Sequence, residues 1–264
     1  MSSVWLCIPS ARPPEEAEKV LRLYRERGYK IALCCDTRAD YDAKGAEAGF
    51  TVREGGTYPG YAVAVNNLIR AAMLLDQSAE WFIAAGDDTE PDPRHSAEEI
   101  AKECREYFRY KSDVPEGLQP DQKYDYQRAR QTFGVMQPTG DRWHEGVGGF
   151  TNAPIDRVCG SAWYGREYCR RMYQGTGPLF SGYKHMYVDE EAQEVAMKMG
   201  VFWQRRDLVQ RHNHWGRGAT DKALVVEPKL PEHLKKWNTQ AHWDESKKLF
   251  LERKAAGFPG HEPL

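Results

Sequence analysis

The amino-acid sequence predicts an α/β protein built on a mostly parallel β-sheet. Two nearly continuous apolar runs, Val4–Ile8 and Lys30–Cys35, have the length and composition of strands buried on both faces of such a sheet. An amphipathic helix with acids in its first turn, Glu15–Arg27, separates them, and Gly28 ends this helix. A strand–helix–strand series of this kind implies a parallel sheet with right-handed crossovers.

The same alternation continues to residue 110. Phe50–Val52 predicts a short third strand, Gly60–Leu75 predicts a helix, and the apolar run Trp81–Ala85 predicts a fourth strand. Prolines soon after this run prevent the strand from continuing. A further amphipathic helix is predicted at Ser96–Tyr110, because its first serine and a glutamate three residues later have the spacing of a capping box.

The second half of the chain is less regular. Residues 111–154 are rich in Pro, Gly, Asp and aromatic side chains, which predicts a long folded loop containing one strand at 131–137. The elements predicted after it are strands at Arg157–Tyr164 and Val201–Gln204 and helices at Arg166–Tyr173, Asp189–Met199 and Ala241–Ala255. We expect one main domain at residues 1–220 and a C-terminal helical extension at residues 221–264.

Length and composition limit the kind of protein. The 264 residues are enough to bury a sizeable core in one large domain. No apolar run approaches the roughly 18 residues that a membrane span needs, and the N-terminus lacks the pattern of a signal peptide. The six cysteines lack zinc-type spacing, so we expect reduced core thiols and a cytoplasmic protein. The net charge of −2 neither requires nor excludes a nucleic-acid partner.

Two adjacent carboxylates, Asp87 and Asp88, follow the predicted strand Trp81–Ala85 after a single glycine. Ligands of an open α/β sheet bind beyond the carboxyl ends of its strands, so both side chains are expected in a binding crevice. Their hard oxygen atoms suit Mg²⁺ or Mn²⁺, which would in turn hold the phosphates of a nucleotide. The simpler alternative is that the pair caps a helix beginning near Pro93.

The order of these motifs resembles that of nucleotide-sugar-dependent glycosyltransferases with the GT-A fold, bacteriophage-type enzymes among them. The resemblance covers roughly residues 4–215 and depends on the order of several short motifs. It implies a Rossmann-type, mostly parallel central sheet flanked by helices, with a smaller acceptor-side region. On this resemblance, residues 1–110 form the nucleotide-sugar-binding half and residues 111–220 the acceptor half.

The resemblance also implies which residues bind the donor. The Pro/Ser loop after the first strand contacts the nucleotide, the acid that ends the second strand contacts base or ribose, and an asparagine lies in the helix before the metal-binding strand. Arginines hold phosphate by bidentate contacts, and Arg12, Arg205 and Arg217 are the candidates here. The implied nucleotide-sugar-binding residues are Pro9, Ser10, Arg12, Asp36, Asn66 or its neighbour Asn67, Asp87 and Arg217.

The metal ligands implied by the resemblance are Asp87, Asp88 and His212, with His214 as the alternative histidine. The family motif is usually Asp-x-Asp, and its second acid would stand at Thr89 here. Because of this departure we favour Asp88 as the main ligand, with Asp87 assisting. A mixed carboxylate and imidazole set favours Mn²⁺ over Mg²⁺.

Asp189 and Glu190 start the predicted helix Asp189–Met199, where inverting members of the family place the catalytic base. The acceptor hydroxyl must lose its proton to a carboxylate within hydrogen-bond reach, and either acid meets this description. Acids in a first helical turn also stabilise the helix dipole without any catalytic role. The aromatic segment Tyr124–Phe150 is expected to act as a lid that excludes water from the sugar.

These features favour a metal-dependent, hexosyltransferase-like glycosyltransferase that moves a sugar from a nucleotide-diphosphate sugar to an acceptor hydroxyl, with inversion. The acceptor stays open between a carbohydrate and a hydroxymethylated base of bacteriophage DNA, in which case the protein acts in the host cytoplasm. Basic residues interleave with Trp203, Trp215, Trp237 and Trp243, a mixture that suits phosphate contact with base stacking. A solvated charged face with aromatic residues in the core explains the same pattern.

Two further alternatives concern the chemistry itself. A nucleotidyltransferase also uses carboxylates to bind metal, but it usually has a glycine-rich loop after the first strand. The corresponding segment here, Pro9–Pro14, contains no glycine, which disfavours that class. A catalytically inactive sugar-nucleotide-binding protein would bind the same ligand without turnover.

Overall fold

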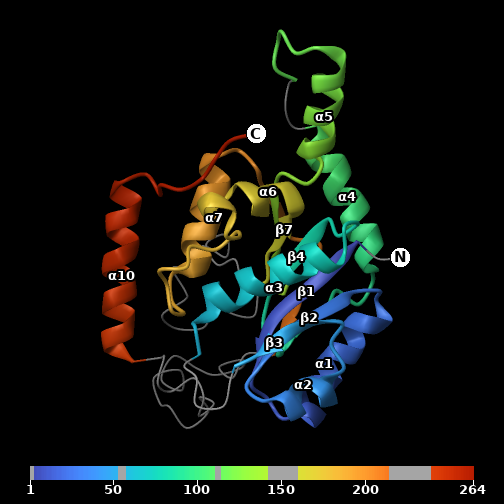
Figure 1. The fold of residues 1–264 in the computed structure, drawn as a ribbon, viewed down its shortest axis with the longest axis vertical. Helices are drawn as coiled ribbons and strands as arrows, with labels where there is room; N and C mark the ends of the chain where they lie inside the picture. Colours follow the sequence, from blue (N-terminus) through green and yellow to red (C-terminus); the bar gives the residue numbers. More distant parts are fainter. Residues whose placement is uncertain (1–2, 53–57, 111–113, 142–159, 214–238) are drawn as a thin grey trace.

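The computed structural model describes residues 3–52, 58–110, 114–141, 160–213 and 239–264 (Figure 1). Its centre is a seven-stranded sheet with the order β3-β2-β1-β4-β7-β6-β8. The seven strands are β1 (Val4–Ser10), β2 (Lys30–Cys35), β3 (Ala48–Thr51), β4 (Trp81–Ala84), β6 (Val135–Pro138), β7 (Trp163–Gly165) and β8 (Phe202–Arg205). Within this sheet β7 runs antiparallel to both of its neighbours, and every other pairing is parallel. The predicted α/β architecture with a mostly parallel sheet is confirmed.

Helices pack on both faces of the sheet and create two hydrophobic cores. Successive residues of β1 point to opposite faces, so Leu6 belongs to one core and Cys7 to the other. One face is covered by α1 (Pro14–Glu26) and α4 (Ala97–Tyr110). The other face is covered by α3 (Tyr61–Leu75), α6 (Arg166–Arg171), α7 (Val188–Lys198) and α10 (Gln240–Ala255).

Two helices lie where no helix was predicted. The first, α2 (Arg38–Lys44), follows β2 directly, and the hydroxyl of Thr37 caps it by accepting from the amide of Asp40. The second, α5 (Pro120–Arg130), lies inside the predicted loop 111–154. Almost all of its side chains are exposed. A helix that buries no face needs no apolar stripe, so the sequence contained no periodic pattern that would indicate it. The part of the predicted lid that falls on residues 142–150 lies outside the described residues.

Several local predictions are confirmed. Ser96 and Glu99 form the expected capping box, in which the Ser96 amide donates to the Glu99 carboxylate and the Glu99 amide donates to the Ser96 hydroxyl. The five cysteines in the described part of the chain are free and buried, as expected for core thiols. Among the described residues no helix combines the length and apolar character that a bilayer crossing requires.

The strand order reverses next to β1. From β1 the chain proceeds outward to β2 and β3, and then α3 returns it to β4 on the opposite side of β1. β1 is therefore paired in parallel with β2 on one side and with β4 on the other. The strand order thus reverses between β1 and β4, and open α/β sheets bind ligands at such a topological switch point.

A small second sheet joins two segments beyond the carboxyl edge. Strand β5 (Thr89–Glu90) pairs antiparallel with β9 (Arg211–His212), and Thr89 stands opposite His212. The amide of Asn213 extends the contact by donating to the carbonyl of Asp88 at 2.7 Å. Because each strand has only two residues, no hydrophobic pattern predicted them.

The carboxylate of Asp92 fastens these two segments together. It is fully buried and accepts hydrogen bonds from the amides of Val209 (2.7 Å), Arg94 (2.8 Å) and His95 (3.1 Å), and it contacts the His95 ring at 2.9 Å. Burial alone raises the pKa of this carboxyl group, but the hydrogen bonds from Val209 and His95 outweigh it. The pKa of Asp92 therefore lies below its ordinary value.

We predict that Asp92→Ala lowers the free energy of unfolding by about 2–4 kcal/mol, because three backbone amides lose their acceptor, two of them on the half-buried residues His95 and Val209. Urea unfolding at pH 7 measures the loss. Since the folded-state pKa is lowered, the stabilisation is complete above the ordinary pKa of 3.8 and disappears as the pH falls through the folded-state pKa. Asp42→Ala, which removes an exposed carboxylate of α2, is the control. Equal stability of Asp92→Ala and this control would contradict the prediction.

Candidate functional site

The loops after β1 and β4 meet at the switch point in a cluster of charged side chains. The hydroxyl of Ser10 donates to Asp87 Oδ2 at 2.6 Å, and Arg12 Nε donates to Asp87 Oδ1 at 2.9 Å. The same guanidinium reaches Asp88 Oδ2 with its Nη2 at 3.3 Å. Residues more than 70 positions apart in the chain, predicted separately as nucleotide and metal contacts, thus form one cluster.

The cluster lies at the surface of the sheet edge and is open to solvent. The side chains of Arg12, Asp87 and Asp88 are 27%, 11% and 18% exposed, respectively. A Cβ atom at Gly86 would lie 2.4 Å from Asp88 Oδ1, so a side chain at this position would force the Asp88 carboxylate to move. A partly exposed ion pair of this kind is weakly stabilising, so its partners are free to exchange for a ligand at little cost.

His212 reaches the same cluster from β9. Its Nε2 atom lies 3.4 Å from Asp88 Oδ1, and its backbone amide donates to Asp141 Oδ2 at 2.9 Å. The side chain of Asn213 also anchors this strand by donating to Glu90 Oε1 at 2.7 Å. The structure thus brings His212 beside Asp88, whereas the alternative histidine, His214, lies outside the described residues.

A buried chain of hydrogen bonds anchors Gln210, the residue that precedes β9, to β7 and α1. Gln210 is 4% exposed, and both the oxygen and the nitrogen of its side-chain amide form hydrogen bonds. The indole of Trp163 in β7 donates to Gln210 Oε1 at 2.7 Å, and Gln210 Nε2 donates to the hydroxyl of Tyr24 in α1 at 3.2 Å. The sequence reasoning missed Gln210, because nothing in a single sequence distinguishes a buried glutamine from an exposed one.

The donor atoms are compatible with a divalent ion held by few protein ligands. Among the described residues no group of three or more His, Cys, Asp or Glu side chains is arranged to hold a metal ion. Asp88 Oδ1 and His212 Nε2 are nevertheless 3.4 Å apart, close to the roughly 3 Å that separates adjacent ligands of an octahedral ion. Mg²⁺ sites of this type take one or two carboxylates and complete the shell with water and substrate phosphates.

Three further residues lie at the same edge of the sheet. Pro9 and Ser10 are the last two residues of β1 and pair with the end of β2, which Asp36 follows directly as an exposed residue. Lys44 was not predicted as a site residue. It is 1% exposed, and its ammonium group donates to the carbonyl of Ser10 at 3.0 Å. Lys44 therefore supports the loop after β1 from inside the protein.

Asn66 has a structural role in the described structure. Its side-chain nitrogen donates to the carbonyl of Leu179 at 2.7 Å, and its side-chain oxygen accepts from the amide of Leu179 at 3.2 Å. The residue is 3% exposed, so both polar ends serve the loop that precedes α7. We do not retain Asn66 among the proposed donor contacts. Arg217, the last predicted donor contact, lies outside the described residues.

Asp189 and Glu190 lie in the first turn of α7, as predicted. The loop before them is connected to the end of β4 by Tyr61, whose amide donates to the carbonyl of Lys184 at 2.8 Å and whose hydroxyl donates to the carbonyl of Ala85 at 3.3 Å. Desolvation, and secondly the charge of Glu190, raises the pKa of Asp189 to about 8. Desolvation also raises the pKa of Glu190. Strongly raised pKa values mark candidates for proton transfer, but Asp189 is mostly protonated at neutral pH and can accept a proton only in its ionised form.

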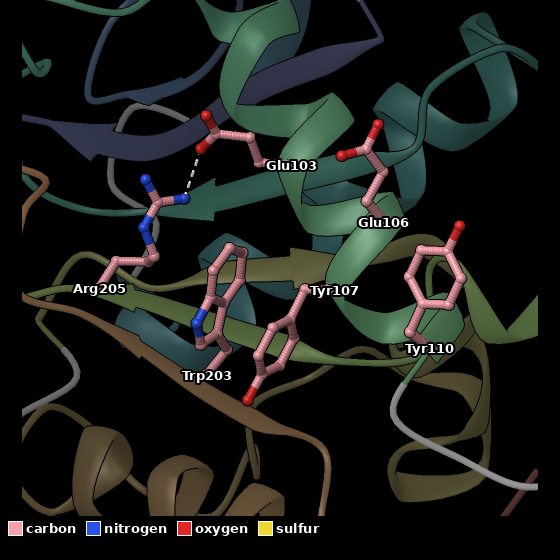
Figure 2. Close-up of a pocket in the computed structure, with 6 residues that line it drawn as sticks. All are labelled: Glu103, Glu106, Tyr107, Tyr110, Trp203 and Arg205. Carbon is pink, nitrogen blue, oxygen red and sulfur yellow. Dashed lines mark hydrogen bonds and ion pairs between the residues drawn. The ribbon is translucent and has the colours of Figure 1, made fainter.

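A separate groove of about 630 Å³ lies between α4 and β8 (Figure 2). Its lining residues are Glu103, Glu106, Tyr107, Tyr110, Trp203 and Arg205. Trp203 stacks on Tyr107 with ring centroids 4.1 Å apart and an interplanar angle of 6°. Arg205 is 8% exposed and bound to two carboxylates, at 2.5 Å to Glu103 and 2.6 Å to Asp207.

These contacts correct one prediction. Arg205 was a candidate for phosphate binding, but two carboxylates already neutralise its guanidinium. Trp203 is half-buried, and its ring stacks on Tyr107 in the groove. The ion pair between Arg205 and Glu103 could not be predicted from a local pattern, because the two residues are about a hundred positions apart in the chain.

Comparisons with known proteins give little further guidance. No protein-family model and no curated protein sequence matches this chain. One solved structure to which the chain is similar is described as the crystal structure of a glycosyltransferase involved in the glycosylation of the major capsid of PBCV-1. The two chains are 12% identical, the alignment covers 86% of this chain and 75% of that one, and the TM-score is 0.31. A likeness this distant decides nothing about the activity of this chain.

The raised pKa of Asp189 predicts a specific pH dependence of stability. Between its ordinary value of 3.8 and about 8, Asp189 is ionised in the unfolded chain and protonated in the folded protein, so stability falls as the pH rises through this range. Asp189→Asn removes this loss. We expect its melting temperature to equal that of the wild type near pH 4 and to exceed it at pH 8. Asp42→Asn on α2 serves as the exposed control, and a pH-independent difference for Asp189→Asn would refute the assignment.

Proposed function

We propose that this protein is a glycosyltransferase that transfers a sugar from a nucleotide-diphosphate sugar to an acceptor hydroxyl. The observation that carries the proposal is the cluster of Ser10, Arg12, Asp87 and Asp88 at the topological switch point. Phosphorylated ligands of open α/β sheets bind at such a point. A cation and two carboxylates from different loops provide the contacts that a diphosphate and its counter-ion require.

The donor would lie along the ends of β2, β1 and β4. In the proposed complex, Asp36 contacts the nucleoside, the loop containing Ser10 and Arg12 contacts the phosphates, and the sugar lies toward Asp88. Arg12 is the residue best suited to the diphosphate, because its guanidinium presents several donors in one plane. Its present partners, Asp87 and Asp88, are partly exposed, which supports an exchange of these ion pairs for phosphate contacts.

We propose that the site is metal-dependent, with Asp88 and His212 as direct ligands and Asp87 assisting. The 3.4 Å between Asp88 Oδ1 and His212 Nε2 supports this set. A bound Mn²⁺ or Mg²⁺ would supply the positive charge that stabilises a diphosphate leaving group. Asp141 and Asn213 would keep His212 oriented through its backbone, so that the imidazole stays beside Asp88.

The acceptor side of the proposal depends on α7. Asp189 or Glu190 would accept the proton of the acceptor hydroxyl, which corresponds to an inverting transfer. Their adjacent positions in the first turn of α7 support this role, in which the ionised form of either carboxyl group accepts the proton. We propose a carbohydrate hydroxyl as the acceptor, because the guanidinium of Arg205 is already paired with two carboxylates, which weakens the alternative of a modified DNA base.

A ligand screen tests the proposal. We expect one of UDP, GDP, TDP and CDP to raise the melting temperature in the presence of Mn²⁺ or Mg²⁺ and not in EDTA. Saturation at about 100 times the Kd adds roughly 2.7 kcal/mol to stability, which corresponds to a rise of about 5 °C for a chain of this size. Asp88→Ala should abolish the shift, while Asp42→Ala, at an exposed position of α2, should keep it.

A measurement of turnover then distinguishes an enzyme from a protein that only binds the nucleotide sugar. The wild-type protein should release the same nucleoside diphosphate from its sugar conjugate, slowly with water and faster with an acceptor. Binding without release would favour the inactive sugar-nucleotide-binding protein. If no nucleotide shifts the melting temperature, or if Asp88→Ala responds like the wild type, the carboxylates serve only to cap and connect loops and the proposed function is wrong.

A further inference from the structure

The C-terminal segment of the chain packs back onto α7 and α6. Helix α10 lies beside α7 in Figure 1, and the tail after it returns over α6. In the tail, His261 forms a β-bridge with Met172, and the amide of Glu262 donates to the carbonyl of Arg171 at 3.1 Å. The described part of the predicted extension, residues 239–264, therefore contributes to the core on this face of the sheet.

A buried carboxylate connects α10 to the first turn of α7. Glu191 is fully buried, and the hydroxyls of Tyr173 and Tyr183 both donate to it at 2.8 Å. Arg253 of α10 completes the set with Nε at 2.8 Å and Nη2 at 2.7 Å. The guanidinium carbon also lies 3.4 Å from the ring centroid of Phe180. Every lone-pair direction of Glu191 thus has a donor, and Arg253 supplies the compensating charge.

A second contact holds the residue on which α7 begins. Tyr187 precedes the helix with φ of 67°, a left-handed conformation that a tyrosine rarely adopts. Its ring packs against α10, with centroids 5.3 Å from Phe250 and 5.9 Å from Trp243. An unfavourable backbone conformation persists only where surrounding contacts enforce it, and here α10 provides them.

Asp189 and Glu190 lie between these two contacts. Tyr187 is fixed before them and Glu191 after them, in both cases by α10. We propose that Arg253 and Tyr187 are positioning residues through which α10 sets the orientation of the first turn of α7, and with it the catalytic base. This inference rests on the proposed function, because it assigns the base of that reaction to Asp189 or Glu190.

The neighbouring ion pair of α10 offers a matched control. Lys254 pairs with Glu194 at 2.6 Å and so also joins α10 to α7, one helical turn further along. Both side chains are partly exposed, 50% for Lys254 and 37% for Glu194, whereas those of Arg253 and Glu191 are 11% and 1% exposed. Lys254→Met therefore removes a charge from the same helix and the same interface and leaves the hydrogen bonds between Arg253 and Glu191 in place.

The test compares Arg253→Met, Arg253→Lys and Lys254→Met with the wild type. Binding of UDP, GDP, TDP and CDP with Mn²⁺ is measured by thermal shift, and kcat is measured from nucleoside-diphosphate release with UDP-, GDP-, TDP- and CDP-glucose. For Arg253→Met we expect nucleotide affinity within twofold of wild type and kcat reduced tenfold or more. Arg253→Lys should recover part of kcat, and Lys254→Met should retain it.

Hydrogen exchange provides a readout that does not depend on activity. In Arg253→Met the amides of residues 188–192 should exchange at least tenfold faster, whereas those of β1 and β4 should not change. Tyr187→Gly leaves the Glu191 cluster intact and accepts the same φ, so it keeps the inference testable if Arg253→Met fails to fold. We expect it to lower kcat without changing nucleotide affinity.

The outcomes separate the inference from the proposed function. If the wild type binds no nucleotide, the proposed function and this inference are both wrong. If the wild type binds and turns over its donor but Arg253→Met and Tyr187→Gly keep wild-type kcat, the positioning role alone is overturned. A kcat lowered equally by Lys254→Met would also overturn it, because any loosening of α10 would then have the same effect.

Discussion

The parallel pairing of β1 with β4 is the constraint on which the candidate site depends. It places the ends of two strands about 75 positions apart in sequence side by side, so that the loop carrying Arg12 faces Asp87 and Asp88. The crossover helices α1, between β1 and β2, and α3, between β3 and β4, cover opposite faces of the sheet. A shift of β4 by one residue would exchange the faces of all its side chains and would move the turn that carries these carboxylates relative to the loop after β1.

Backbone contacts, more than side-chain contacts, assemble the rest of the site. The segment that carries His212 is attached to the segment after β4 by strand pairing and by the Asn213 amide on the Asp88 carbonyl. Buried polar side chains, Asp92 and Gln210, reinforce this attachment from beneath. The side chains of the candidate site thus lie on loops, and other residues hold those loops in place. Sites on loops over a rigid sheet are commonly built in this way.

Those parts of the fold that bury continuous apolar surface were predictable from the sequence. β1, β2 and β4 appear as apolar runs because both of their faces are covered, and α4 announces its start through a capping box. By contrast, α5 packs almost nothing and β9 has only two residues, so neither leaves a pattern. Long-range pairings were equally unpredictable. The sequence does not reveal that Arg205 pairs with Glu103 or that Asn66 is hydrogen-bonded to Leu179.

The dependence of α7 on α10 has a consequence for synthesis of the chain. Translation proceeds from the N-terminus at about 5–20 residues per second, so α7 leaves the ribosome before Arg253 does. Until then Glu191 has only tyrosine hydroxyls as donors and no compensating charge. A chain interrupted before α10 would keep the β1–β4 edge but leave the first turn of α7 without its support. Completion of the polypeptide would then itself control when the first turn of α7 becomes ordered.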